Sequence, residues 1–236
     1  LVTDDTKVAA ATATVTLNDA AGVAVTAAEL SAIGGKTSGT VTVSNAVAIS
    51  GNTDQVTAAL VTADTLVVAT SATVTVSDTP TISELNAIAA KTDGVVTATL
   101  AANSLTNLGA LSTAGTDAIG ITVNDAAEAA VTSANLSVLG GKTSETVTVT
   151  NAVAITGDHD QVTAALVTND TKVTAATATV TVNDAAEVAV TAAELSAIGG
   201  KTSGAVTVSN AVAITGDHDQ VTAALVTDDT KVTAAT

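Results

Sequence analysis

The sequence predicts an α/β fold, a parallel β-solenoid of about eight coils in which each coil contributes a strand and a short helix. Three observations favour this class: long internal repeats, strictly alternating valine and threonine in short stretches, and capped apolar segments of helical period between them. An all-β solenoid is the alternative. Each coil buries its apolar stripe only against its neighbours, so no coil is expected to fold alone.

The repeats have two periods. Residues 147–174 match residues 206–233 at all but two positions, Thr150/Ser209 and Asn169/Asp228, which defines a large repeat that starts at 147 and again at 206. Smaller 22–33-residue units open at Val15, Val41, Val74, Val96, Ile121, Val147, Val180 and Val206. We predict that residues 1–236 form one continuous solenoid segment of such coils, arranged in 59-residue double repeats. Because "LVTDDTKV" at 1–8 recurs at 225–232, we expect this segment to be part of a longer chain.

Each unit opens with a strand of the "VTV" type. Alternation places valines inward and threonines outward, and the strands that begin at 15, 41, 74, 147, 180 and 206 are expected to lie side by side in register. An Asp or Asn follows four positions after the first valine in seven of the eight units, where its side chain can hydrogen-bond backbone amides at a corner. A second short strand is expected near residues 23–25, 46–49, 152–155, 188–190 and 211–214.

The segments after these strands predict helices. Thr26 with Glu29 forms a capping box, and Gly34 is placed to end the helix in the left-handed conformation. Capping pairs recur at Thr81/Glu84 and Thr191/Glu194, with half of the box at Thr132/Asn135. In alternate coils the "DQVTAALVT" segments are expected to begin at Asp54, Asp160 and Asp219 as caps, and residues 103–115 are predicted to form a further clear helix.

Composition excludes several classes of function. The chain is 47% apolar but has no Phe, Trp, Tyr, Met or Cys, so its core must be built from Val, Ile, Leu and Ala. A net charge of −16 without aromatic residues argues against binding nucleic acid. Polar residues interrupt every apolar run, which argues against membrane insertion. No nucleophile elbow, phosphate loop or metalloprotease motif is present, so we expect no enzyme.

The stretch "GDHD" raises the question of a metal site. Asp158, His159 and Asp160 supply oxygen and nitrogen ligands, and Asp217, His218 and Asp219 form a second set in the next copy of the large repeat. The third copy has Asn52 and Thr53 before Asp54, which favours a turn followed by a helix cap over a metal site. No resident cofactor is expected. Calcium is possible where acidic corners of neighbouring coils meet.

Threonines alternate along the expected strands and, when stacked, would form ladders of hydroxyl groups. The Thr-x-Thr pairs are Thr14/Thr16, Thr40/Thr42, Thr73/Thr75, Thr97/Thr99, Thr146/Thr148 and Thr179/Thr181. These dipeptides resemble the ice-binding face of threonine-rich β-solenoid antifreeze proteins. The alternative is that threonine, a good strand former, simply finishes an exposed face.

Three segments carry a wider resemblance: "TAAELSAIGGKTSGTVTVS" at 26–44, "TISELNAIAAKTDGVVTATL" at 81–100 and "LTNLGALSTAGTDAIGITVND" at 105–125. They resemble repeats of very large cell-surface and secreted proteins of cyanobacteria and other marine bacteria. The resemblance implies an extracellular, elongated protein with a structural or adhesive role, and we expect this chain to be a structural segment of an extracellular or cell-surface filament or scaffold. Because the two ends of an open parallel stack can pair with identical ends of another copy, we also expect head-to-tail self-association. A ligand-binding solenoid, either a calcium-dependent adhesin or an ice binder, is the competing hypothesis.

Overall fold

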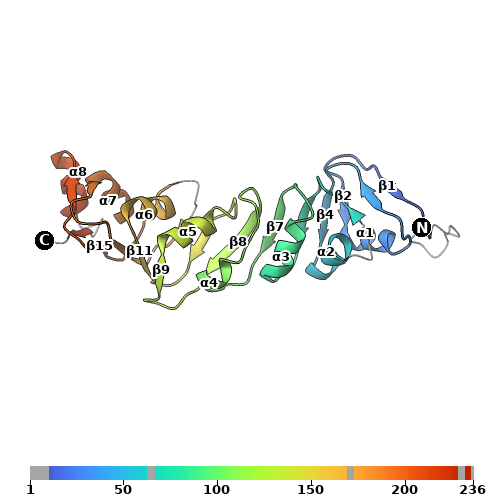
Figure 1. The fold of residues 1–236 in the computed structure, drawn as a ribbon, viewed down its shortest axis with the longest axis horizontal. Coiled ribbons are helices and arrows are strands. Elements are labelled where there is room, and N and C mark those ends of the chain that lie inside the picture. The colour runs from blue at the N-terminus through green and yellow to red at the C-terminus, as the bar shows by residue number, and fades with distance from the viewer. Residues whose placement is uncertain (1–10, 63–66, 169–172, 228–231, 235–236) are drawn as a thin grey trace. The chain divides into compact units, whose positions relative to one another are not determined.

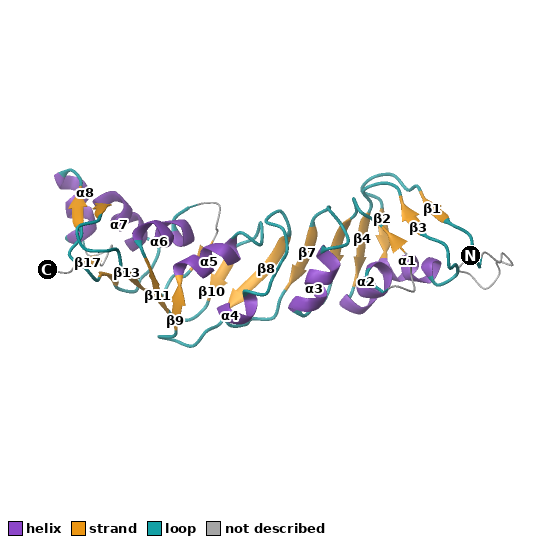
Figure 2. Cartoon of the chain, viewed as in Figure 1, coloured by secondary structure: helices purple, strands orange, loops and turns teal. Residues whose placement is uncertain are grey.

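The computed structural model describes residues 11–62, 67–168, 173–227 and 232–234. Within these residues the chain forms eight helices and mostly short strands, so the predicted α/β class is confirmed (Figure 2). The chain divides into two compact units, Leu1–Ala101 with Leu111–Gly120 as unit 1, and Ala102–Ala110 with Ile121–Thr236 as unit 2.

Unit 1 alternates strands with two-turn helices. Its strands are β1 (Val15–Leu17), β2 (Ala24–Thr26), β3 (Val41–Val43), β4 (Ala48–Gly51), β5 (Val67–Val68), β6 (Thr73–Val76) and β7 (Val96–Thr99), together with residues 118–120 of β8 (Ala118–Val123). Its helices are α1 (Ala27–Gly34), α2 (Thr53–Leu60) and α3 (Ile82–Ala89).

Unit 2 repeats this alternation. Its strands are residues 121–123 of β8, β9 (Ala130–Thr132), β10 (Val147–Val149), β11 (Ala154–Gly157), β12 (Val173–Thr174), β13 (Thr179–Val182), β14 (Ala189–Thr191), β15 (Val206–Val208), β16 (Ala213–Thr215) and β17 (Val232–Ala234). Its helices are α4 (Leu105–Leu108), α5 (Ser133–Gly140), α6 (His159–Leu166), α7 (Ala192–Gly199) and α8 (His218–Leu225).

Within the described residues every strand pair is parallel. Each strand pairs with a strand further along or further back in the sequence, as Val15 lies opposite Val41 and Thr97 opposite Ala118. We call the stretch of sequence between two such paired positions one turn of the chain. We call each series of hydrogen-bonded neighbouring strands a row. The rows of unit 1 are β1-β3-β5 and β2-β4-β6-β7-β8, and those of unit 2 are β8-β10-β12, β9-β11-β13-β15-β17 and β14-β16. Successive turns are therefore joined by backbone hydrogen bonds, although the sheets do not close on themselves.

The expected register is confirmed in part. Val15 lies opposite Val41 and Val180 opposite Val206, as predicted. The strands that begin at 41 and 74 are not neighbours, however, and neither are those at 147 and 180. Val41 pairs instead with Val67, and Val74 with Ile49 of the second row.

Two very short strands, β5 and β12, explain this correction. They lie in the longer units that open at Val41 and Val147, and they occupy the places expected for the strands at 74 and 180, because Val67 pairs with Val41 and Val173 with Val147. The valine-rich strand that follows then moves to the other row, where Val180 pairs with Ile155. The apolar alternation in the sequence cannot show this shift, since so short a strand has no period.

The core is thin and aliphatic, as the composition requires. Leu30, Ile49, Leu85, Ile155 and Leu195 are among the largest side chains that are fully buried. In unit 1, α1 packs against α2 and α2 against α3, one after another beside the strands (Figure 1). Along the strands valines are buried and threonines exposed, as β3 illustrates.

The capping boxes are confirmed at Thr26/Glu29, Thr81/Glu84 and Thr191/Glu194, and the half box is confirmed at Thr132/Asn135. Helix ends differ from expectation. Gly34 is not left-handed; α1 closes through Gly35 in right-handed helical conformation, with its amide bonded to the Ser31 carbonyl. A tight last turn satisfies the carbonyls without a positive φ.

Two other helix predictions are wrong. Asp54, Asp160 and Asp219 are not N-caps, because the caps of α2, α6 and α8 are Asn52, Asp158 and Asp217. Each cap side chain accepts from the backbone amide of the Gln three positions on, so the residue two positions before the surviving Asp sets the helix start. Residues 103–115 hold a single turn, α4, which is closed by Gly109.

The recurring "KT-x-G" motif joins consecutive turns of the chain. The Thr92 hydroxyl donates to the Ala72 carbonyl of the turn before and accepts from the Gly94 amide. Thr37 and Thr202 make the same pair of bonds. A Cβ on Gly94 would lie 2.6 Å from the Ala72 carbonyl carbon, so glycine is required by the close approach of the two backbones.

Candidate functional site

His159 is the first residue of α6, and its ring lies against a carboxylate from a later turn of the chain. Asp158 caps the helix by accepting from the Gln161 amide at 2.8 Å. Asp184, at the corner after β13, accepts from the His159 amide at 2.9 Å through Oδ2. Its Oδ1 lies 2.6 Å from His159 Nδ1. One carboxylate therefore holds both the backbone and the ring of this residue.

The environment of the ring favours its charged form. The side chain of His159 is 14% exposed and that of Asp184 is 4% exposed. Burial by itself lowers the pKa of His159, but the hydrogen bond to Asp184 and the negative charges of Asp184, Asp160 and Glu194 outweigh it. The pKa of His159 is therefore raised above its ordinary value of 6.5.

Three potential metal ligands lie close together around this ring. His159, Asp160 and Glu194 each offer one ligand atom, and these atoms lie within 4.8 Å of one another. His159 Nε2 is 3.4 Å from Asp160 Oδ1. Glu194 belongs to the capping box of α7, where Thr191 donates to its Oε2 from both the backbone amide and the hydroxyl group. The cluster thus joins α6 to the start of α7.

Sequence reasoning found His159 and Asp160 but missed Asp184 and Glu194 as their partners. These two carboxylates lie far beyond His159 in the chain, and each has a local reason to be present, a corner and a capping box. The signal that was available is the offset from one turn to the next, which brings the corner aspartate onto the helix start of the preceding turn.

The third copy of this stretch, at residues 52–54 in unit 1, uses the same geometry without a histidine. Thr53 opens α2, and Asp78 Oδ1 accepts from its amide at 2.7 Å and its hydroxyl at 2.6 Å. In α4 the amide of Leu105 donates to Asp125 at 2.7 Å. The corner aspartate is therefore a helix-start acceptor in all three places, which supports a structural role for it.

The second predicted set of metal ligands, Asp217, His218 and Asp219, has no corner aspartate bound to its helix start among the described residues. His218 opens α8 with its side chain 89% exposed, and its Nε2 is 2.8 Å from Asp219 Oδ1. Asp217 caps α8. The structure therefore places Asp158 and Asp217 in caps and brings together a larger cluster at His159 than at His218.

Asparagine corners make a different contact. The side-chain amides of Asn45, Asn151 and Asn210 donate to the backbone carbonyls of Asp19, Asp125 and Asp184, at 2.6–2.7 Å. In each pair the asparagine reaches back to the aspartate corner of the turn before. Aspartate side chains thus accept at their corners and asparagine side chains donate at theirs, while the unit that opens at Val96 has Leu100 in this place.

The threonines form single rows and not paired ladders. All residues of the Thr-x-Thr set are exposed except Thr181, which is half-buried. In unit 2 one row runs through Thr132, Thr156, Thr181, Thr207 and Thr233 on five neighbouring strands. The next outward position is occupied mainly by alanine, since Ala130 lies opposite Ala154, and Ala154 lies opposite Thr179.

In the other rows Thr16 lies opposite Thr42, Thr75 opposite Thr97, and Thr148 opposite Thr122 and Thr174. Thr97 and Thr99 face Ala118 and Gly120 on the other side. The sequence predicts two parallel files of threonine, one for each threonine of pairs such as Thr14/Thr16, Thr40/Thr42 and Thr146/Thr148. No described sheet carries both files across all of its strands, because consecutive Thr-x-Thr strands often lie in different rows.

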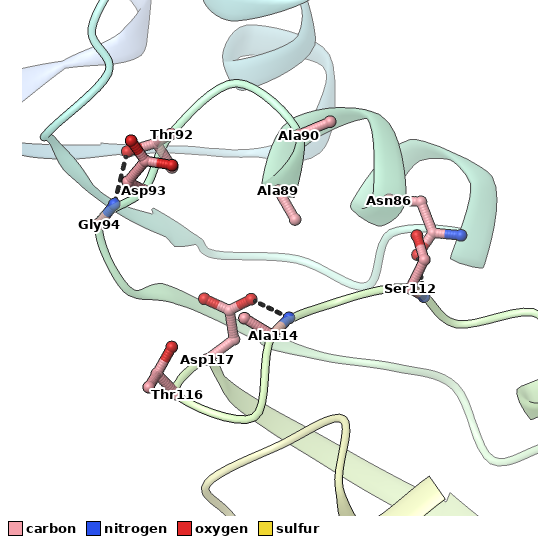
Figure 3. Close-up of a pocket in the computed structure, with 10 residues that line it drawn as sticks. All are labelled: Asn86, Ala89, Ala90, Thr92, Asp93, Gly94, Ser112, Ala114, Thr116 and Asp117. Atoms are coloured by element: carbon pink, nitrogen blue, oxygen red, sulfur yellow. Dashed lines mark hydrogen bonds between the residues drawn. The ribbon is translucent and has the colours of Figure 1, made fainter. Parts of the chain in front are cut away.

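A cavity of about 310 Å³ lies in unit 1 between the end of α3 and the loop at 112–117 (Figure 3). Its polar groups hold the loop in place: Asn86 accepts from the Ser112 amide, and Asp117 accepts from the amides of Ala114 and Val96. Such engaged groups explain the conformation of the loop and give no sign of a ligand.

No family model, curated protein or solved structure matches this chain. None of the helices in the described part of the chain is long and apolar enough to cross a bilayer.

Proposed function

We propose that this chain is a structural repeat segment, a parallel α/β solenoid that serves in an extracellular or cell-surface filament or scaffold. The observation that carries the proposal is the turn-to-turn pairing: within each unit every described strand pair is parallel and joins one turn of the chain to the next. Stacking of this kind builds length and not an enclosed site.

The composition and the side-chain contacts fit a durable scaffold. Capping boxes, "KT-x-G" bridges and corner carboxylates use polar side chains to fix the path of the backbone. The chain also lacks cysteine, methionine and the readily oxidised aromatic residues, which suits long exposure outside a cell.

Self-association head to tail is part of this proposal. Among the described strands β17 pairs with β15 alone, so its other edge offers unpaired backbone groups to a further parallel strand. A second copy of the chain, or a further repeat of the same chain, has the strand type and direction that such an edge accepts.

Small-angle X-ray scattering on chains of increasing length tests the stacking. Each added double repeat supplies two further strand steps of ~4.8 Å, so the maximum dimension should grow by about 10 Å while the cross-section stays constant. Growth of the cross-section with length would refute a solenoid. Electron micrographs of concentrated protein test the polymer, for which we expect filaments of uniform width.

Ice binding is the second candidate, favoured by the row of five threonines in unit 2. The alanines in the adjacent position leave one regular file where a flat lattice would need two. Thermal hysteresis of the protein separates the hypotheses, since a scaffold would show none.

A further inference from the structure

We propose that His159, Asp160 and Glu194 bind a divalent transition-metal ion, with Zn²⁺ as the ion of the right chemistry, between α6 and α7. This goes beyond the scaffold function and does not depend on it. The ion would link the start of one helix to the start of the next, and so hold two successive turns of the chain together.

The geometry of the imidazole is the first argument. Nδ1 is occupied by Asp184, whose side chain is 4% exposed, and Nε2 is therefore the nitrogen directed toward Asp160. A carboxylate on one ring nitrogen that fixes the orientation of the other is the usual arrangement of metal-binding histidines. Asp184 is thus a positioning residue, and it is held in turn by the His159 amide.

Distances provide the second argument. Tetrahedral zinc with bonds of ~2.0–2.1 Å places its ligand atoms about 3.3–3.4 Å apart. His159 Nε2 and Asp160 Oδ1 are already separated by 3.4 Å, and all three ligand atoms lie within 4.8 Å. Both capping bonds of Glu194 go to Oε2, so Oε1 takes part in neither of them and is the oxygen that would bind the ion while the capping box stays in place.

Charge is the third argument. Asp160, Asp184 and Glu194 place three carboxylates around one imidazole. A proton on the ring offsets one negative charge, whereas a divalent cation offsets two. Three protein ligands leave the fourth position of a tetrahedral ion to water, and a nitrogen ligand favours Zn²⁺ over Ca²⁺, which prefers oxygen.

The chain itself supplies matched variants. His159→Thr copies Thr53, which keeps the bond to the corner aspartate at the start of α2 but has no ring. Glu194→Gln copies Gln55 and Gln220, which complete capping boxes in α2 and α8 without a carboxylate. Both variants should fold, because each replacement already works at the same helix position. His218→Thr is the control, since the side chain of His218 is 89% exposed.

The test is calorimetric titration of the full chain with Zn²⁺ at pH 7.5 after treatment with a chelator. We expect one Zn²⁺ site that weakens at least tenfold in His159→Thr and in Glu194→Gln, with circular dichroism spectra like the parent's, and that is unchanged in His218→Thr. An affinity unaffected by both site variants, or an equal loss in His218→Thr, would overturn the proposal.

A second readout needs no variant. X-ray absorption at the zinc edge of the loaded parent should show nitrogen and oxygen neighbours at ~2.0 Å with the scattering of one imidazole. Absence of the imidazole signal would overturn the assignment of His159. Ca²⁺ that displaces Zn²⁺ at equal concentration would do the same, because it would show a site made of carboxylates alone.

Discussion

Gly94→Ala should destabilise unit 1 substantially, because the added methyl group has no space between two backbones. Its Cβ would lie 2.6 Å from the Ala72 carbonyl carbon and closer still to the carbonyl oxygen. Carbon atoms pack at ~3.5 Å or more, so the two backbones must separate by roughly 0.9 Å. That shift also strains the bond from the Thr92 hydroxyl to the Ala72 carbonyl.

Overpacking of this kind costs about 1–3 kcal/mol, and rigid backbone on both sides favours the upper end of that range. For a chain of this length a loss of ~3 kcal/mol lowers the melting temperature by roughly 6–12 °C. Thermal unfolding followed by circular dichroism measures the shift. Hydrogen exchange at the Val96 amide, which donates to Asp117, shows whether the loss is local.

Gly35→Ala is the matched control. A Cβ there would meet its nearest neighbour, the Ser31 carbonyl oxygen, at an ordinary 3.5 Å, and Ala90 already ends α3 at the same position. We expect no loss of stability and a gain of up to about 1 kcal/mol from the stiffer unfolded chain. An unchanged melting temperature for Gly94→Ala, or an equal fall in Gly35→Ala, would refute the reasoning.

Three further predictions concern other parts of the chain. Glu187→Gly should stabilise unit 2 by about 0.5–1 kcal/mol in urea titration, because Glu187 has φ +67° where the first copy has Gly22; an unchanged midpoint would argue against strain there. Hydrogen bonds from the Thr81 hydroxyl and, to a smaller extent, from the Thr81 backbone amide hold the pKa of Glu84 below its ordinary value of 4.5. A pKa that is lower in the folded state stabilises the protein above the unfolded-state pKa, and this stabilisation is lost as the pH falls through the folded-state pKa. The melting temperature of Glu84→Gln should therefore depend less on pH in that acid range than the melting temperature of the parent. Parallel curves for the two proteins would contradict this. Leu195→Ala, at a fully buried site, should cost about 2.7–5 kcal/mol, and Val138→Ala, at a side chain 63% exposed, less than about 0.5 kcal/mol; similar midpoints for the two variants would exclude the assigned core.

Features set by near neighbours in sequence were predictable. The capping box at Thr26 and Glu29 is local, and the buried valines of β3 follow from alternation alone. The helix expected at 103–115 shows the limit of such reasoning. Its apolar residues have helical spacing, but Gly109 ends the helix after one turn, and Leu111 is buried in an irregular segment.

Features set by the next turn of the chain could not be predicted from the sequence. β5 and β12 are too short to show a period, yet they decide which row Val74 and Val180 join. Asp184 meets His159 from the following turn, and no local pattern reports that meeting. The left-handed corner at Glu128 and Glu187 was signalled only by Gly22 in the corresponding place.

The order of aspartate and asparagine corners in the C-terminal repeats limits how this part of the chain can gain or lose length. Asp184 accepts from the helix start at His159, and Asn210 donates to the Asp184 carbonyl. Removal of the single coil 180–205 would bring Asn210 to the place of Asp184, so the start of α6 would face a side-chain amide where it now faces a carboxylate. Removal of a whole 59-residue double repeat would keep a carboxylate at each such helix start in this part of the chain, so length changes in steps of two coils should be tolerated best.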